Sequence, residues 1–141
     1  MTHRNTYVSR YSKPMDTHEL EALGEAAAAK NRKLGITGFL MATGGMFYQV
    51  LEGPQDAVED IYSAIVEDDR HTDLIQLRSE KNAPGLLYPD WSMKTINLDA
   101  ASHVRLLPLK ALVKSVYEQK RLVDNMLWAI ERTMQHEKGN L

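Results

Sequence analysis

The sequence predicts an α+β fold of the ferredoxin-like type, a βαββαβ arrangement with an extra fifth strand and a C-terminal helical extension. Two observations lead to this prediction. Apolar residues change between strand-like and helix-like spacing in that order along the chain. The Gly44-Gly45 pair joins two apolar segments as a two-residue hairpin turn. With right-handed crossovers, both internal helices then cover one face of a mainly antiparallel sheet, in which the first and third strands are central neighbours.

The first half of the chain contains three strand segments and one helix. Residues 5–11 (NTYVSRY) are rich in β-formers and end before a proline-containing breaker, which predicts the first strand. Asp16 is typical of a helix N-terminus, and we expect a helix from this residue to the stop at Gly35. Residues 36–43 and 46–53 have strand length and flank the hairpin turn, so they should pair antiparallel.

The second half of the chain continues with a helix, two strands and a last helix. Pro54 suits the first turn of the second helix, whose apolar stripe ends after Val66. Residues 74–77 predict the fourth strand, and residues 91–98 predict the fifth strand after a loop rich in proline. From Pro108 to about residue 136 the apolar spacing is helical. This last stripe should cover the bare face of the sheet, another subunit, or both.

Length and composition limit the class of protein. The 141 residues suit one domain, in which we expect residues 1–98 to form the core and residues 99–141 a helical extension on the sheet or at a subunit interface. A net charge of −2 gives no basic field for nucleic acid, and the absence of cysteine excludes disulfides. We find no signal-peptide core and no run near the ~20 apolar residues of a membrane span, so we expect a cytoplasmic protein.

A glutamine is the unusual residue of the third strand. Because side chains alternate along a strand, Phe47, Gln49 and Leu51 share a face, which places a primary amide between two large apolar groups. A buried amide without partners costs about 1 to 3 kcal/mol, so Gln49 should bond to a group on another element. Tyr7, on the neighbouring first strand, is within hydrogen-bonding reach if it shares this face.

Five segments of the sequence together resemble the BLUF family, the small domains that sense blue light using flavin. The resemblance covers roughly residues 5–98. The segments follow in family order and spacing: YVS at 7–9, Asn31 six residues before the TG of GITGFL, FYQVLEG at 47–53, DDRH at 68–71, and YPDWSM at 88–93. Each segment alone is a weak signal, but five in register with the predicted elements favour membership of this family.

The resemblance implies a flavin ring between the two internal helices and a photochemical role for two residues. Gln49 would bond to flavin N5 or the C4 carbonyl and also to Tyr7, and Asn31 would bind the C4 carbonyl and N3 edge. Excited flavin would take an electron and a proton from Tyr7 and return them, which leaves the hydrogen bonds of Gln49 rearranged and the absorption red-shifted. A primary amide is both donor and acceptor, so rotation or tautomerisation of Gln49 would each serve.

The resemblance also assigns further residues. Arg32 would lie against the C2 carbonyl, and Trp91 and Met93 would share one face of the fifth strand and relay the change at the glutamine. An arginine common before the aromatic of the last segment is absent here. Four more residues match positions near the ribityl chain and phosphate: Lys30, Asp68, Arg70 and His71. The cofactor implied is FAD, with FMN or riboflavin as alternatives.

Taken one at a time, these residues have ordinary explanations. Tyr7, Gln49 and Trp91 would serve as core residues, Asn31 as a helix cap, and Arg70 as a cation near a helix C-terminus. Only their joint spacing favours a functional interpretation.

The sequence offers no catalytic apparatus. The five histidines form no i, i+4 pair and no cluster with carboxylates, so we expect neither a metal site nor an enzyme. We expect a homo-oligomer that signals to an unknown downstream protein, without binding nucleic acid or membrane. Two alternatives stay open: a flavin-free, dimeric ferredoxin-like ligand-sensing or interaction module, and a small cofactor-independent monooxygenase. The colour of the purified protein distinguishes them.

Overall fold

The structure, a computed structural model, describes residues 2–141, without the side chains of residues 101–103. It contains five strands, three α-helices and one short 3₁₀-helix. In chain order these are β1 (Thr2–Tyr11), α1 (Thr17–Leu34), β2 (Thr37–Thr43), β3 (Met46–Pro54), α2 (Gln55–Glu67), β4 (His71–Ala83), β5 (Lys94–Asn97), the 3₁₀-helix η1 (Ala101–Leu106) and α3 (Leu107–Glu137).

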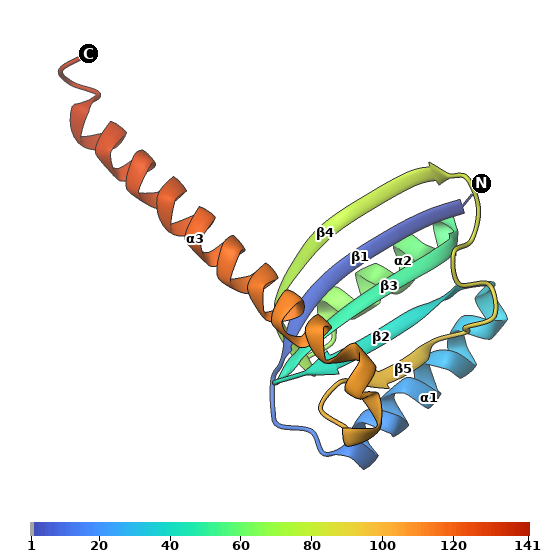
Figure 1. The fold of residues 1–141 in the computed structure, drawn as a ribbon. Coiled ribbons are helices and arrows are strands. Elements are labelled where there is room, and N and C mark those ends of the chain that lie inside the picture. The colour runs from blue at the N-terminus through green and yellow to red at the C-terminus, as the bar shows by residue number, and fades with distance from the viewer. Residues whose placement is uncertain (1) are drawn as a thin grey trace.

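The five strands form one sheet in the order β4-β1-β3-β2-β5 (Figure 1). β3 lies between β1 and β2 and is antiparallel to both, and β4 pairs antiparallel with the other edge of β1. β5 adds to β2 in parallel. This order is that of the split βαβ motif. The prediction of an α+β ferredoxin-like fold with an extra strand and a C-terminal helix is confirmed.

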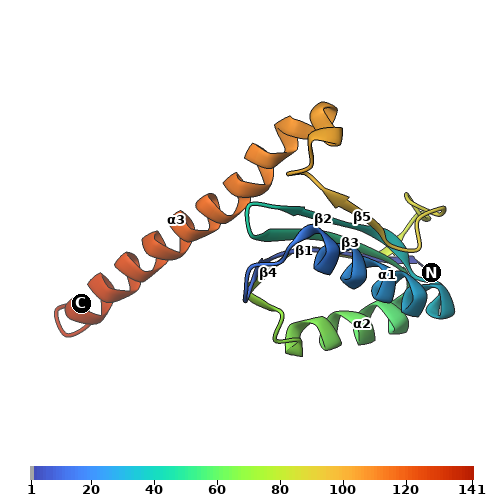
Figure 2. The same ribbon diagram turned by 90° about the horizontal axis from the view of Figure 1, so that it is seen from below.

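The sheet is covered on both faces. α1 and α2 lie on one face, and α3 begins on the opposite face (Figure 2). Alternation along β1 to β3 therefore builds two apolar clusters. The cluster under α1 and α2 contains Tyr7, Leu20, Ile36, Leu40, Ala42, Phe47, Leu51, Val58, Ile61 and Met93. The cluster under α3 contains Val8, Phe39, Met41, Met46, Val50, Ile96, Leu98, Val113 and Tyr117.

Local signals in the sequence fix the element ends. The Asp16 carboxylate accepts a hydrogen bond of 2.8 Å from the backbone N–H of Glu19, which caps α1 as expected. Gly44 and Gly45 have φ values of 55° and 80°, the left-handed pair that a tight hairpin turn requires. The helix start at Pro54 and the helix end at Gly35 also agree with the sequence prediction.

Two strands differ from the prediction. β4 begins at His71 and continues to Ala83, far beyond the predicted 74–77, because its polar residues face solvent at the sheet edge and are held by backbone pairing with β1. β5 is shorter than the predicted 91–98. It begins only at Lys94, since the residues before it form a turn in which the Trp91 N–H donates to the Tyr88 carbonyl.

α3 packs on the sheet only through its first part. Val113 and Tyr117 are buried, and the Tyr117 hydroxyl donates to the Asp73 carbonyl of β4 at 2.5 Å. Asp99, just after β5, accepts from Thr43 and Gly44 of the hairpin and pairs with Lys110 of α3 at 3.1 Å. No residue of α3 after Tyr117 is buried, and the C-terminal part of the helix runs away from the sheet (Figure 1). Within the described chain, only this end of α3 covers the open face of the sheet.

Candidate functional site

A cavity lies between α1 and α2, with β1 and β3 as its floor. Its volume is about 200 Å³. Leu23 and Ala27 of α1 face it from one side, and Ile61 and Ile65 of α2 from the other. The full lining is Tyr7, Leu23, Ala26, Ala27, Lys30, Asn31, Leu40, Phe47, Gln49, Leu51, Ile61, Ala64, Ile65, Asp68, Arg70 and His71. The cavity thus combines aliphatic walls with a few convergent polar groups, as ligand sites commonly do.

Tyr7 and Gln49 form a buried polar pair in the floor of the cavity. They are directly opposite each other in the register of β1 and β3, and only 1% of Tyr7 and 5% of Gln49 is exposed. The Tyr7 hydroxyl donates to Gln49 Oε1, and Gln49 Nε2 donates to the sulfur of Met93 at 3.2 Å. A thioether is a weak acceptor, so the amide N–H is held only loosely. The predicted contact of phenol and amide is confirmed.

Burial keeps Tyr7 protonated. Its pKa is raised far above the usual value of a phenol, chiefly by burial and further by neighbouring Tyr62 and Asp68. The Tyr62 ring lies 5.7 Å from that of Tyr7. Tyr7 therefore keeps its hydroxyl proton over the physiological pH range and can donate it to Gln49 Oε1.

His71 is a half-buried polar residue at the cavity. It is the first residue of β4, its Nδ1 lies 3.1 Å from the hydroxyl of Ser9, and its Nε2 is buried without a partner among the described residues. Burial lowers the pKa of His71, so the neutral imidazole is favoured. The unpartnered nitrogen is available to a polar group of a bound molecule.

Asn31 joins the cavity to the loop before β5. It lies in the last turn of α1 and is only 2% exposed. Its side-chain amide donates to the Ser92 carbonyl at 3.3 Å and also lines the cavity. Gly35, not the side chain of Asn31, caps the helix. The amide is thus a polar group directed at two places, the cavity and the loop.

Charged side chains complete the lining of the cavity. Asp68 and Arg70 form a close pair, with Arg70 Nη2 donating to Asp68 at 2.5 Å. This hydrogen bond lowers the pKa of Asp68 to about 2. The charge of Arg70 is therefore largely matched within the chain, and Lys30 is the other cation of the lining. Arg32 follows Asn31 on α1 but does not line the cavity.

Met93 and Trp91 lie on opposite faces of the sheet. Met93 belongs to the cluster under α1 and α2 and contacts Gln49. The Trp91 ring stacks on Tyr88 at 5.6 Å and meets Phe39 of the other cluster at 6.2 Å, with 38% of the residue exposed. The expectation that both residues share one face of the fifth strand is wrong, because both precede the strand and the chain turns between them.

The residues present fit a flat heteroaromatic ring with a polar edge. Aliphatic side chains face each other from two helices, and alanines at 26, 27 and 64 leave space between them. The amides of Gln49 and Asn31 and the unpartnered nitrogen of His71 offer donors and acceptors. The sequence reasoning missed the aliphatic wall. The sequence signal for this wall is a pair of apolar residues at i, i+4 spacing on each of the two helices: Leu23 with Ala27, and Ile61 with Ile65.

Known proteins are similar to this chain in sequence and in structure. The family model for sensors of blue light using FAD (BLUF) matches residues 2–94. The photoactivated adenylate cyclase subunit beta of Euglena longa is 43% identical over 70 residues, which cover 50% of this chain and 8% of that protein. This chain therefore corresponds to a small part of that relative.

Two solved structures show the same fold. A bacterial light-regulated adenylyl cyclase is 33% identical, with a TM-score of 0.80 over 89% of this chain and 36% of its own. BlrB, a BLUF protein solved in its dark state, is 26% identical, with a TM-score of 0.65 over 84% of this chain and 96% of its own. The family model covers most of the chain, and both folds agree with it. The chain belongs to the BLUF family of blue-light sensors that use FAD.

Proposed function

We propose that this chain is a blue-light receptor that binds a flavin in the cavity between α1 and α2. The observation that carries the proposal is the buried hydrogen bond from Tyr7 to Gln49 at the floor of that cavity. FAD is the expected cofactor, with FMN or riboflavin as alternatives.

Aliphatic side chains of α1 and α2 hold the flat ring, and Asn31 and Gln49 bond to its polar edge. The ribityl chain and phosphate of the cofactor are bound by Lys30, Arg70 and His71, and Asp68 orients Arg70. Arg32 contributes only by a change of rotamer, because it does not line the cavity.

A bound flavin supplies the absorption of blue light and, when excited, takes up an electron and a proton. Tyr7 is the donor of both, because its neutral hydroxyl is buried and bonded to the side chain that faces the cavity. Gln49 would relay the proton, and both the electron and the proton would then return to Tyr7. As both donor and acceptor, its carboxamide can exchange the groups bonded to its oxygen and nitrogen without any change of net charge. The amide then bonds more strongly to the chromophore, and the absorption moves to the red.

The loop before β5 responds to the rearrangement of the Gln49 amide. In the structure, Gln49 Nε2 donates a hydrogen bond to the sulfur of Met93, which directly precedes β5. When the Gln49 amide rearranges, its N–H group points elsewhere and the hydrogen bond to the Met93 sulfur is lost. Beyond β5, Asp99 connects the hairpin to α3 through Lys110. Trp91, on the other face, relays movement of the same loop to Tyr88 and Phe39.

The output leaves through the C-terminal part of the chain. In this division residues 1–98 bind the flavin and residues 99–141 transmit the signal. α3 carries an exposed apolar stripe beyond its contact with the sheet, formed by Val123, Met126, Leu127, Ile130 and Met134. A second copy of the chain or a downstream protein binds this stripe. Light shifts a two-state equilibrium of this segment and no substrate is turned over.

The test is optical. Chain purified with its flavin, or reconstituted with FAD, should be yellow, should shift its visible absorption to the red under blue light, and should recover in darkness. Reconstitution with FMN and riboflavin in parallel ranks the three cofactors. A colourless chain that takes up none of them, or a flavin-loaded chain whose spectrum is inert to light, rules the proposal out.

No helix within residues 2–141 is long and apolar enough to span a bilayer.

A further inference from the structure

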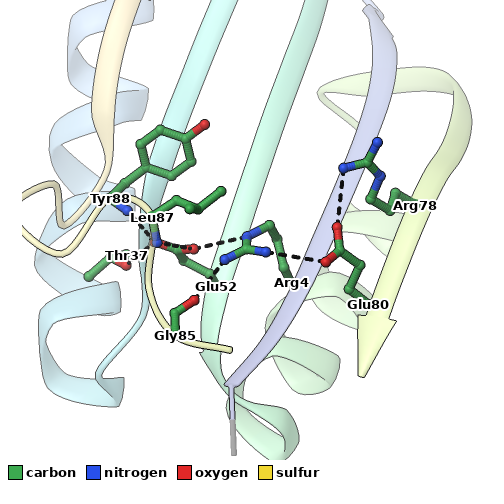
Figure 3. Close-up of polar contacts among 8 residues, drawn as sticks. All are labelled: Arg4, Thr37, Glu52, Arg78, Glu80, Gly85, Leu87 and Tyr88. Atoms are coloured by element: carbon green, nitrogen blue, oxygen red, sulfur yellow. Dashed lines mark hydrogen bonds and ion pairs between the residues drawn. The ribbon is translucent and has the colours of Figure 1, made fainter. Parts of the chain in front are cut away.

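A fully buried glutamate lies on the face of the sheet opposite the cavity. Glu52 is 0% exposed and belongs to β3, three residues after Gln49. Its carboxylate accepts four hydrogen bonds: from Arg4 at 3.1 Å, from the Thr37 hydroxyl at 3.0 Å, and from the backbone N–H groups of Leu87 and Tyr88 at 3.0 and 2.6 Å (Figure 3). Both oxygens are thus fully used, as a buried carboxylate requires.

Arg4 extends the same network across the sheet. It is 6% exposed and lies opposite Glu52 in the register of β1 and β3. Its Nη2 donates to the Gly85 carbonyl at 2.7 Å, and its Nη1 reaches Glu80 of β4 at 3.3 Å (Figure 3). We call Arg4 and Glu52 the clamp. Both residues use the fixed geometry of guanidinium and carboxylate to hold several groups at once.

The clamp holds the loop of residues 84–93, which joins β4 to β5. Within the described chain, every hydrogen bond from residues 84–90 to the strands ends on Arg4 or Glu52. The following residues of the loop then contact the site. The Trp91 carbonyl accepts from Gly38 of β2, the Ser92 carbonyl from Asn31, and the Met93 sulfur from Gln49.

Four residues separate the last clamped residue, Tyr88, from Met93. The Trp91 N–H bonds back to the Tyr88 carbonyl at 3.1 Å, so this short span is itself a closed turn. Because this turn is short and closed by a hydrogen bond, a displacement of Tyr88 also displaces Trp91 and Met93. Removal of the clamp should move the thioether relative to Gln49 although the two sites lie on opposite faces.

We propose that Arg4 and Glu52 are positioning residues for the photoreaction: their buried pair fixes the 84–93 loop and so sets where Met93 meets Gln49. The inference rests on the proposed function for its kinetic consequence. Its structural part concerns this chain alone and holds with or without flavin.

The direct experiment is NMR of the flavin-free chain labelled at the methionine methyl groups, seven in all. Met93→Leu assigns the Met93 resonance. Glu52→Gln keeps the size of the side chain but leaves one acceptor oxygen where four donors converge, so the loop is released. The Met93 methyl should then shift or broaden. In flavin-loaded protein the rate of dark recovery should change by about threefold or more, a modest change in barrier.

Two variants serve as matched controls. Thr37→Val removes one hydrogen bond to Glu52 without touching a loop contact. Glu80→Gln neutralises the part-buried partner of Arg4 on β4, with the same change of charge as Glu52→Gln. Both should leave the Met93 methyl in place and recovery within about twofold of wild type. Equal effects in Glu52→Gln and in these controls would overturn the inference.

The decisive contrary result is a Met93 methyl that does not move in Glu52→Gln although the amide resonances of Leu87 and Tyr88 show a released loop. If Glu52→Gln does not fold, Arg4→Lys decides by the same criteria, since an ammonium keeps the charge but cannot reach Glu52, Glu80 and Gly85 together. A chain that takes up no flavin removes the proposed function, yet the flavin-free spectra still decide whether the clamp positions Met93.

Discussion

Gln49 lies directly opposite Tyr7 across β1 and β3, and the tyrosine hydroxyl donates to the oxygen of the glutamine amide. Both side chains are buried under α1 and α2. The amide nitrogen has only the sulfur of Met93. One side of the amide is therefore strongly bonded and the other weakly, which leaves the nitrogen side ready to change partner.

Tyr7→Phe should retain flavin but lose the light-induced red shift. The substitution removes only the hydroxyl, so the shape of the floor is kept while the donor of the proton is lost. Stability should fall by about 1 to 3 kcal/mol because Gln49 Oε1 loses its buried partner. Light-minus-dark absorption spectra and chemical denaturation measure the two effects. An undiminished photocycle would remove Tyr7 from its proposed role.

Gln49→Leu should also abolish the red shift while the fold persists. Leucine is close to glutamine in volume and suits the apolar neighbours Phe47 and Leu51. The free energy of unfolding should fall by about 1 to 3 kcal/mol, because the Tyr7 hydroxyl is left unpaired. The double variant with Tyr7→Phe should lose less than the sum of the two single losses. Additive losses would show that the two side chains are not coupled, and a persistent red shift would exclude Gln49 as the switch.

His71 should titrate below its ordinary pKa of 6.5, because burial disfavours the imidazolium. The unfolded chain then takes up the proton more readily than the folded one. The contribution of His71 to stability is full above about pH 6.5 and is lost as the pH falls through the lower folded pKa. NMR titration of the ring measures the midpoint, and His71→Gln should remove this part of the pH dependence. A midpoint at or above 6.5 would contradict the burial argument.

The two parts of α3 should differ in their effect on the core. Val113→Ala removes buried groups and should lower stability by about 1.5 kcal/mol. Leu127→Ala, at a side chain that is 49% exposed, should change stability by less than about 0.5 kcal/mol in dilute protein. At high concentration Leu127→Ala should weaken self-association in sedimentation experiments. Equal losses of stability for both variants in dilute protein would mean that the end of α3 folds back on the core.

Strong local signals explain what the sequence predicted correctly. The Asp16 cap, the paired glycines of the hairpin and the alternating strands each act within a few residues, and together they determine the sheet order that brings Tyr7 beside Gln49. The spacing of aliphatic residues along α1 and α2 also indicates which residues form the walls of the cavity. Only the structure shows that these two aliphatic stripes face each other across a space.

Long-range contacts explain what the sequence did not predict. β4 is polar along most of its length, and its pairing with β1 depends on residues about seventy positions away, such as the bond from Gln76 to Asn5. The place of Trp91 is set by stacking on Tyr88 and by a turn, not by strand alternation. Glu52 belongs to the FYQVLEG segment, but its four donors come from three other segments of the chain.

The central claim is that light rearranges the hydrogen bonds of one amide, that of Gln49. Light-minus-dark infrared spectra of flavin-loaded chain, with glutamine labelled at its side-chain carbonyl carbon, measure this directly. The account predicts a label-sensitive carbonyl band that moves on illumination, returns in the dark, and is missing from Gln49→Leu. A full visible red shift without any label-sensitive carbonyl change, or with the same change in Gln49→Leu, would contradict it.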